Sequence, residues 1–183
     1  MNKIEFSSGF AYPFNRAVGL LNILWWFIPI IGWFALFGYG INIVKHFVNG
    51  DFKELPKFNF GKNFILGFIM FFKAIPFAIA ITVVYIIAGI IPFAGILGIL
   101  FISLFIVPIL TINFFKKETV ESYFELKKLN AVFNNLGEYI IALLKSIALK
   151  IIFILMIIVL VGIPAAAFTR NIFLADFYRR YVK

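Results

Sequence analysis

Residues 64–115 read FILGFIMFFKAIPFAIAITVVYIIAGIIPFAGILGILFISLFIVPILTINFF and contain a single charged side chain, Lys73. A helix needs about 20 mainly apolar residues to cross a bilayer. This stretch is more than twice as long, so it must cross, turn near Pro92 and cross back. The run predicts an all-α, polytopic integral membrane protein.

The composition of the whole chain is that of a membrane domain. Its 183 residues are 63% hydrophobic, against about 45–50% in ordinary globular domains. We therefore expect one membrane domain over residues 1–183 and no separate soluble domain. The chain has no cysteine and one histidine, His46, so thiolate sites, two-histidine metal sites and the usual catalytic triads lack their components. The sequence predicts no metal and no cofactor.

Basic residues concentrate in the short segments between the apolar runs. The net charge is +9, and this distribution is typical of loops retained on the cytoplasmic side of a membrane. We therefore expect the chain to lie in the lipid bilayer of the cell membrane, to contact anionic lipid head groups at its cytoplasmic face and to bind no nucleic acid.

Three charge-free segments containing proline predict the tips of three helical hairpins. The tips are Ile28-Pro29-Ile30-Ile31-Gly32, Ile91-Pro92-Phe93-Ala94-Gly95 and Gly162-Ile163-Pro164. The hairpins then cover about residues 10–50, 62–115 and 136–183, as four full spans plus shorter or partial helices. Both termini and both basic loops come to lie in the cytoplasm, which agrees with the positive-inside rule.

A second topology has four spanning helices, roughly 17–39, 64–91, 93–115 and 139–163. It places the termini opposite the basic loops and divides the positive charge between the two sides, which the positive-inside rule disfavours. The two topologies differ most clearly in residues 17–49, which form one span or a hairpin. Proline alone does not decide between them, because spanning helices tolerate it where neighbours pair the freed carbonyl.

Residues 117–135 predict one amphipathic helix. Apolar side chains recur there at helical spacing, with Glu118 and Glu121 early and Lys127 and Lys128 later, as the helix dipole prefers. The helix is expected either to lie flat on the cytoplasmic surface of the membrane or to dock against the bundle.

A few polar side chains interrupt the apolar blocks and form the candidate intramembrane site. They are Lys73, Thr111, Asn113, Lys145, Lys150 and Asp176. One interpretation is that the lysines extend to the interface, since Lys73 and Lys145 each precede a tip proline by 19 residues. The other is that they face the bundle interior, where cations without acidic partners would attract an anion.

Asp176 is the only carboxylate expected deep in the last hairpin. A lone charge in a spanning helix is costly, so an inward-facing Asp176 should pair with Lys150, or less readily with Lys145. The alternative is an interfacial acid that faces water beside Arg179 and Arg180.

Two functional classes fit these features. One is transport or permeation of a small anionic solute. The other is a non-catalytic membrane scaffold, interaction or immunity protein that acts through its Lys-rich cytoplasmic face. No pair of acids, histidine dyad or thiol lies in the apolar blocks, so we expect no enzyme activity. Small residues at helical spacing fit packing within the chain, and also a homo-oligomer.

Short motifs in the first half of the chain resemble those of a known family. They are Tyr12-Pro13-Phe14, Ile28-Pro29-Ile30, Gly38-Tyr39, Gly50-Asp51 and Leu55-Pro56. The order resembles an uncharacterised prokaryotic family of small multi-pass membrane proteins, known as a domain of unknown function. The resemblance covers about residues 10–95 and, more loosely, Gly162-Ile163-Pro164 and the tail. It implies a membrane topology but no mechanism.

Overall fold

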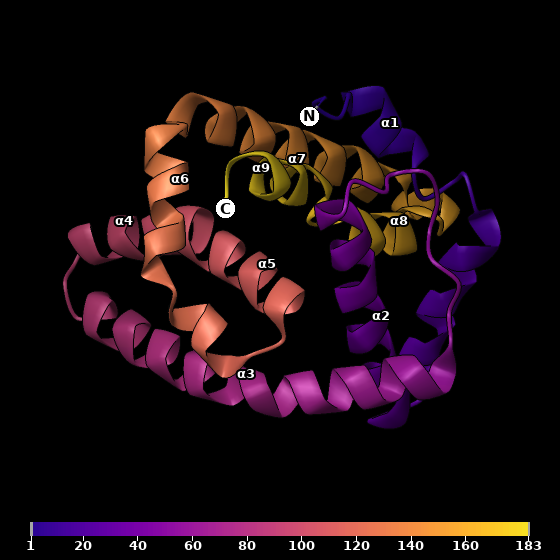
Figure 1. Cartoon of the computed structure of the whole chain (residues 1–183), viewed down its shortest axis with the longest axis horizontal. Helices are drawn as coiled ribbons and strands as arrows, with labels where there is room; N and C mark the ends of the chain where they lie inside the picture. The colour runs from indigo at the N-terminus through magenta and orange to yellow at the C-terminus, as the bar shows by residue number, and fades with distance from the viewer. Residues whose placement is uncertain (1, 183) are drawn as a thin grey trace.

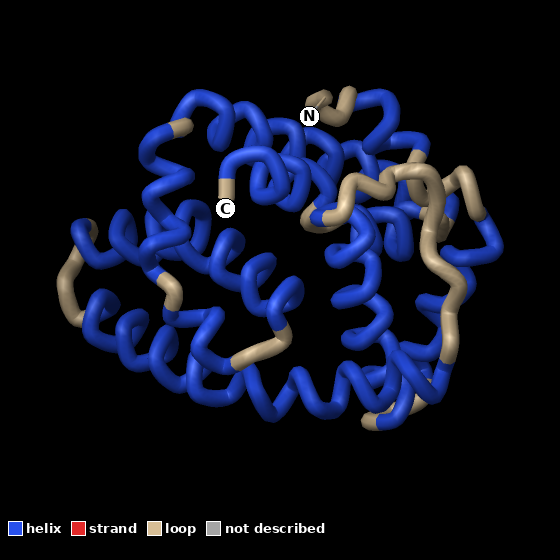
Figure 2. The backbone as a smooth tube through the Cα atoms, in the orientation of Figure 1, coloured by secondary structure: helices blue, strands red, loops and turns tan. Residues whose placement is uncertain are grey.

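The computed structural model describes residues 2–182, and these form helices and loops without a strand (Figures 1 and 2). The elements are α1 (Phe6–Ala11), η1 (Ala17–Phe27), α2 (Ile31–Val48), α3 (Phe60–Gly89), α4 (Ala94–Phe101), η2 (Ile102–Ile106), α5 (Val107–Lys117), η3 (Val120–Phe124), η4 (Leu126–Leu129), α6 (Asn130–Asn134), α7 (Leu136–Leu155), η5 (Met156–Val159), α8 (Gly162–Thr169) and α9 (Ile172–Tyr181). Of the η segments, η2 is a π-helix and the others are 3-10 helices.

Four helical stretches are long and apolar enough to cross a bilayer. They are Ile31–Val48, Phe60–Gly89, Ala94–Lys117 and Leu136–Val159. Most apolar side chains of the last three are exposed on the outside of the bundle, which is favourable only in contact with lipid. The structure thus confirms an all-α, multi-pass membrane protein.

In Figure 1, α3 follows one long edge of the molecule and α7, α8 and α9 lie along the opposite edge. Helix α2 stands across α3, and α5 lies between the two edges. Helices α3 and α4–α5 diverge from their shared turn, so the second hairpin is open rather than closely paired.

The first two hairpin tips share one backbone geometry. Ile30 (φ 62°, ψ −67°) and Phe93 (φ 59°, ψ −61°) each follow the proline, and the next residue's N–H donates to the proline carbonyl at 2.6 Å. These are classic γ-turns, which are rare because they strain a residue that carries a side chain. The turn at Pro29 breaks the single helix over 17–39 that the four-span topology required.

The third turn lies earlier than expected. Leu160 has a φ of 59°, and the Val161 N–H donates to the Val159 carbonyl at 2.7 Å. Pro164 instead occupies the first turn of α8. N–H groups in the first turn have no acceptor within the helix, so a proline there removes no helical hydrogen bond. The expected tip at Gly162-Ile163-Pro164 is therefore corrected to residues 159–161.

Helices α2 and α3 make the most extensive helix–helix contact, and two glycines permit it. A Cβ on Gly38 would lie 1.9 Å from the carbonyl oxygen of Asn63, and one on Gly67 would lie 1.9 Å from that of Phe34. The backbones thus approach each other reciprocally, as small residues allow in membrane helices.

The expected amphipathic helix over 117–135 is broken into η3, η4 and α6. Glu118 ends α5 in the left-handed conformation (φ 58°), so the helix cannot continue through it. Tyr123 is inserted between Phe77 and Phe114, with ring centroids 4.1 and 4.0 Å away. The segment is therefore docked against the bundle, which was one of the two expected arrangements.

Both chain ends lie beside the loop that follows α2. The guanidinium of Arg179 donates to the Asn2 carbonyl at 2.6 Å and lies 5.1 Å from the centroid of the Phe52 ring. Lys3 pairs with Glu138 at the start of α7 at 2.7 Å. One face of the molecule therefore carries both termini and the loop after α2.

Pro108 creates an unpaired carbonyl in the third spanning stretch, and a tyrosine pairs it. Proline has no N–H, so the carbonyl of Leu104, four residues earlier, loses its regular helical donor. The Tyr139 hydroxyl donates to this oxygen at 2.5 Å. The π-helix η2 immediately precedes Pro108, and the bond joins α7 to this irregular backbone.

We expect Gly38→Ala to lower the melting temperature in detergent, because the added Cβ collides with the backbone of α3. Overpacking of this kind costs about 1–3 kcal/mol. Gly40→Ala on the same helix is the matched control, since a Cβ there meets nothing within 4 Å. If both variants melt at the same temperature, the close approach of α2 and α3 is wrong.

We expect Tyr139→Phe to lower the free energy of unfolding by about 1–2 kcal/mol, because it leaves the Leu104 carbonyl unpaired. The loss should shrink in a Pro108→Ala background, where residue 108 supplies an N–H. A thermal-unfolding double-mutant cycle measures this coupling, and strictly additive effects would contradict the assigned role of Tyr139.

Candidate functional site

The structure places the six sequence-predicted polar residues in separate surroundings. Lys73 binds the end of α5: its Nζ donates to the Glu118 carbonyl at 2.7 Å. The Glu118 carboxylate in turn accepts from Lys45 at 2.5 Å. A cation at a helix C-terminus stabilises the helix dipole, so Lys73 holds the α5 terminus and is engaged by a main-chain partner.

Thr111 and Asn113 belong to the contact between α5 and the η3 segment. Asn113 is fully buried, donates to the Ser122 carbonyl at 2.7 Å and accepts from the Tyr178 hydroxyl at 2.5 Å. Burial raises the pKa of the Tyr123 hydroxyl, and a hydrogen bond with Thr111 offsets part of this effect. Asn113 is thus structural, whereas Thr111 also lines a cavity described below.

Asp176 does not pair with either lysine, which corrects the expected Lys150 bond. The carboxylate is buried and bonds Arg179 at 2.6 Å and Arg180 at 3.0 Å. Both arginines lie within four residues of it on α9, so its charge is balanced locally and at less conformational cost than across helices. The alternative expectation was an acid that faces water beside Arg179 and Arg180. Its partners are these two arginines, but the Asp176 carboxylate is buried and does not face water.

Lys145 lies near Asp176 without bonding it. Its Nζ donates to the Ile4 carbonyl at 3.3 Å and lies 5.6 Å from the centroid of the Phe173 ring. The N–H of Ile4 in turn lies 3.4 Å from the Asp176 carboxylate. Lys145 and Asp176 therefore fix the amino-terminal segment against the last hairpin.

Arg170 lines more than one cavity of the structure. It lies between α8 and α9, and its side chain is exposed. Within residues 2–182 it has neither a hydrogen bond nor an acidic partner in contact. It lines three cavities, of about 230, 520 and 370 Å³, that adjoin at its side chain.

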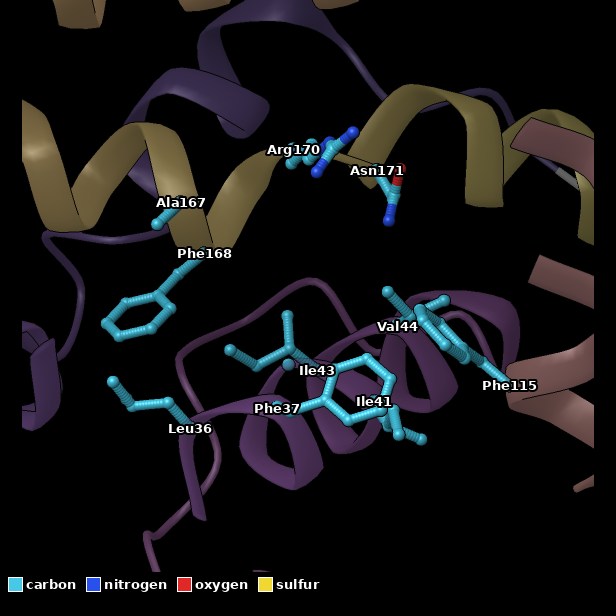
Figure 3. Close-up of a pocket in the computed structure, with 11 residues that line it drawn as sticks. Leu36, Phe37, Ile41, Ile43, Val44, Phe115, Ala167, Phe168, Arg170 and Asn171 are labelled. Carbon is cyan, nitrogen blue, oxygen red and sulfur yellow. The ribbon is translucent and has the colours of Figure 1, made fainter. Parts of the chain in front are cut away.

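The smallest of these cavities lies between the last hairpin and α2. Figure 3 shows Arg170 and Asn171 at the junction of α8 and α9; the Asn171 amide points toward the apolar side chains of α2, whereas Arg170 stays beside the ribbon at the edge of the space. Phe37 and Val44 contribute to the α2 wall, and Phe115 closes it from α5. The wall of this cavity that faces Arg170 and Asn171 is therefore mostly apolar.

The other two cavities connect Arg170 with polar residues of neighbouring helices. The 520 Å³ cavity is lined by Lys150 and Ser146 of α7. The 370 Å³ cavity is lined by Ser103 of η2 and Thr111 of α5. Of the six predicted residues, Lys150 and Thr111 thus line two different cavities, and Arg170 lines both of these cavities.

Sequence reasoning did not single out Arg170, although a signal was present. It is the only charged residue between Gly162 and Ala175. Charged residues are rare in such apolar stretches of membrane proteins, and where they occur they are often functional. Over the described part of the chain, no group of three histidines or acids could hold a metal ion. The charged side chains that line the three cavities are those of Arg170 and Lys150.

Comparison with known proteins gives a family but no activity. No curated protein and no solved structure matches the chain. One family model, described as Protein of unknown function (DUF4013), matches residues 21–162. The match spans more than half of the 183 residues, so the chain belongs to the DUF4013 family, an uncharacterised family as the resemblance of its motifs predicted.

Proposed function

We propose that this protein binds a small anionic solute inside the membrane and lets it pass through the helix bundle. One observation carries the proposal: Arg170, a cation without an acidic partner among residues 2–182, lines three adjoining cavities between apolar helices. Charged residues at membrane depth normally pair or face water, and unpaired ones mark solute pathways.

The electrostatics around Arg170 favour an anion over a cation. Lys150 lines the same 520 Å³ cavity and, like Arg170, has no ion pair within the described residues. Asp176, the acid of the last hairpin, is already bound by Arg179 and Arg180. Two cations that line one cavity produce a positive potential there, which attracts anions.

We propose that the protein is not an enzyme, because no carboxylate, imidazole or thiol lines the three cavities around Arg170. The cavities there are lined by cations, hydroxyls, an amide and apolar side chains. A scaffold that acts through the cytoplasmic face is the other functional class. Exposed Lys53, Lys57 and Lys62 suit anionic head groups there, but a scaffold role leaves the cavities at Arg170 unexplained.

We also propose that the protein lies in the cell membrane with both termini and the basic loops in the cytoplasm. The bond from Arg179 to the Asn2 carbonyl and its contact with Phe52 support a common side for the two termini and the loop after α2. The excess of lysine and arginine in these segments supports the cytoplasm as that side.

Anion flux from liposomes containing the purified protein tests the function. We expect release of acetate, and we expect Arg170→Gln to reduce it by about tenfold, or ~1.4 kcal/mol of barrier. Lys62→Gln removes a surface charge and is the matched control. Size-exclusion chromatography verifies that the variants fold. Absence of flux, or flux that is indifferent to Arg170→Gln in a folded protein, rules out the proposal.

Single cysteines test the topology, since the native chain has none. Cysteine in place of Asn2, Lys57, Asn130 or Val182 should be shielded from an impermeant thiol reagent in intact cells and react after permeabilisation. Labelling of Val182→Cys from outside, with Lys57→Cys protected, would show that the two lie on opposite sides.

A further inference from the structure

The 520 Å³ cavity beside Arg170 has walls of two kinds. Lys150 approaches from α7 and Arg170 from the junction of α8 and α9, so two cations on different elements line one space. Most of the remaining wall is aliphatic and consists of Leu104, Leu143, Ile147, Leu149, Ala166 and Ala167. The cavity therefore combines a charged part with an apolar part.

The two hydroxyls that line this cavity have their protons engaged elsewhere. Ser146 donates to the Ala142 carbonyl at 2.9 Å, and Thr169 donates to the Ala165 carbonyl at 2.6 Å. The side-chain donors left for a ligand are therefore those of Lys150 and Arg170. They can bind an oxyanion from two directions, the guanidinium in a bidentate manner.

Few donors and a long apolar wall disfavour a small, strongly hydrated anion. Such an ion loses its hydration shell on entry and must find a replacement for every hydrogen bond, which aliphatic walls do not provide. An anion with an apolar body loses less hydration and gains from burying that body. The volume also falls within the range of about 300–1,000 Å³ that holds organic ligands.

The apolar wall is accessible from the outside of the bundle. Ile147 is 43% exposed and Ala167 is also exposed, yet both line the cavity. An apolar chain can therefore enter from the lipid side while its acidic head reaches the two cations.

We infer that the Lys150–Arg170 cavity binds an amphiphilic anion, with a carboxylate or phosphate head between Lys150 and Arg170 and an aliphatic chain against α7 and η2. This inference rests on the proposed function for Arg170 as the anion-binding residue, and it adds the chemical class of the ligand. The same chemistry is present in free fatty acids and alkyl phosphates and in anionic membrane lipids.

Ligand binding to the full chain in an uncharged detergent tests the inference. The probes form two pairs. Acetate and decanoate share a carboxylate head, and inorganic phosphate and decyl phosphate share a phosphate head; only the second member of each pair carries a long apolar chain. Isothermal titration should give at least about tenfold tighter binding for each chain-bearing probe. Protein-free micelles correct for partition of the chains. Phosphatidate in phosphatidylcholine nanodiscs, followed by native mass spectrometry, distinguishes a membrane lipid from a free amphiphile as the source.

Variants assign the binding to this cavity. Lys150→Gln and Arg170→Gln should each weaken decanoate binding about tenfold, whereas Lys62→Gln should not change it. Ala167→Phe, at an exposed position, should fill the apolar part and weaken decanoate but leave acetate unaffected. The inference is wrong if acetate and decanoate bind with equal affinity, or if Lys150→Gln does not weaken decanoate binding. Either result leaves the proposed anion function intact. Absence of binding by any of the anions overturns both.

Discussion

Within a hydrocarbon layer every main-chain N–H and C=O needs a partner from the protein, and the rest of this structure depends on that constraint. It explains why the described residues between the loops are helical. It also explains the treatment of three of the prolines. Pro29 and Pro92 stand at turns, where the lost N–H interrupts no helix. Pro108 lies within a helical stretch, and the Tyr139 hydroxyl pairs the carbonyl that it frees.

A charged side chain without a partner is also costly in a hydrocarbon layer, and several charged side chains of the bundle are bound by neighbouring groups. Asp176 is bound by two arginines of its own helix. Lys73 is bound by the last carbonyl of α5. The two exceptions in the bundle are Lys150 and Arg170, which line one cavity together. A fold that balances its other deep charges locally, yet leaves these two facing a shared space, points to a ligand of opposite charge.

Sequence periodicity and charge were sufficient to predict the membrane class, the spanning stretches Phe60–Gly89, Ala94–Lys117 and Leu136–Val159, and the turns at Pro29 and Pro92. These depend on local composition and on the geometry of proline. The last arm was expected to span as well, but it is broken at Arg170 into the short helices α8 and α9. The third turn was predicted too late because Pro164 also fits the first turn of a helix. The segment 117–135 was predicted as one helix because periodicity does not detect a left-handed residue such as Glu118.

The candidate site was harder to predict, because it depends on which distant helices meet. Lys150 and Thr111 were identified from their apolar surroundings, but the cavities that each shares with Arg170 depend on how α7 and α5 pack against the last hairpin. Lys73 and Asn113 showed the same local pattern and proved to be engaged by the Glu118 carbonyl and by Ser122 and Tyr178. Sequence spacing does not distinguish a free polar group from a paired one.

The sign of the potential beside Arg170 can be measured directly with one cysteine. Thr111 shares a cavity with Arg170, so Thr111→Cys places a thiol there in a chain that otherwise has none. A sulfonate-bearing methanethiosulfonate should modify it about tenfold faster than a trimethylammonium-bearing one, because a nearby cation concentrates anions. Arg170→Gln should abolish the preference. Equal rates with the two reagents, or faster modification by the cationic one, would contradict an anion site in this bundle.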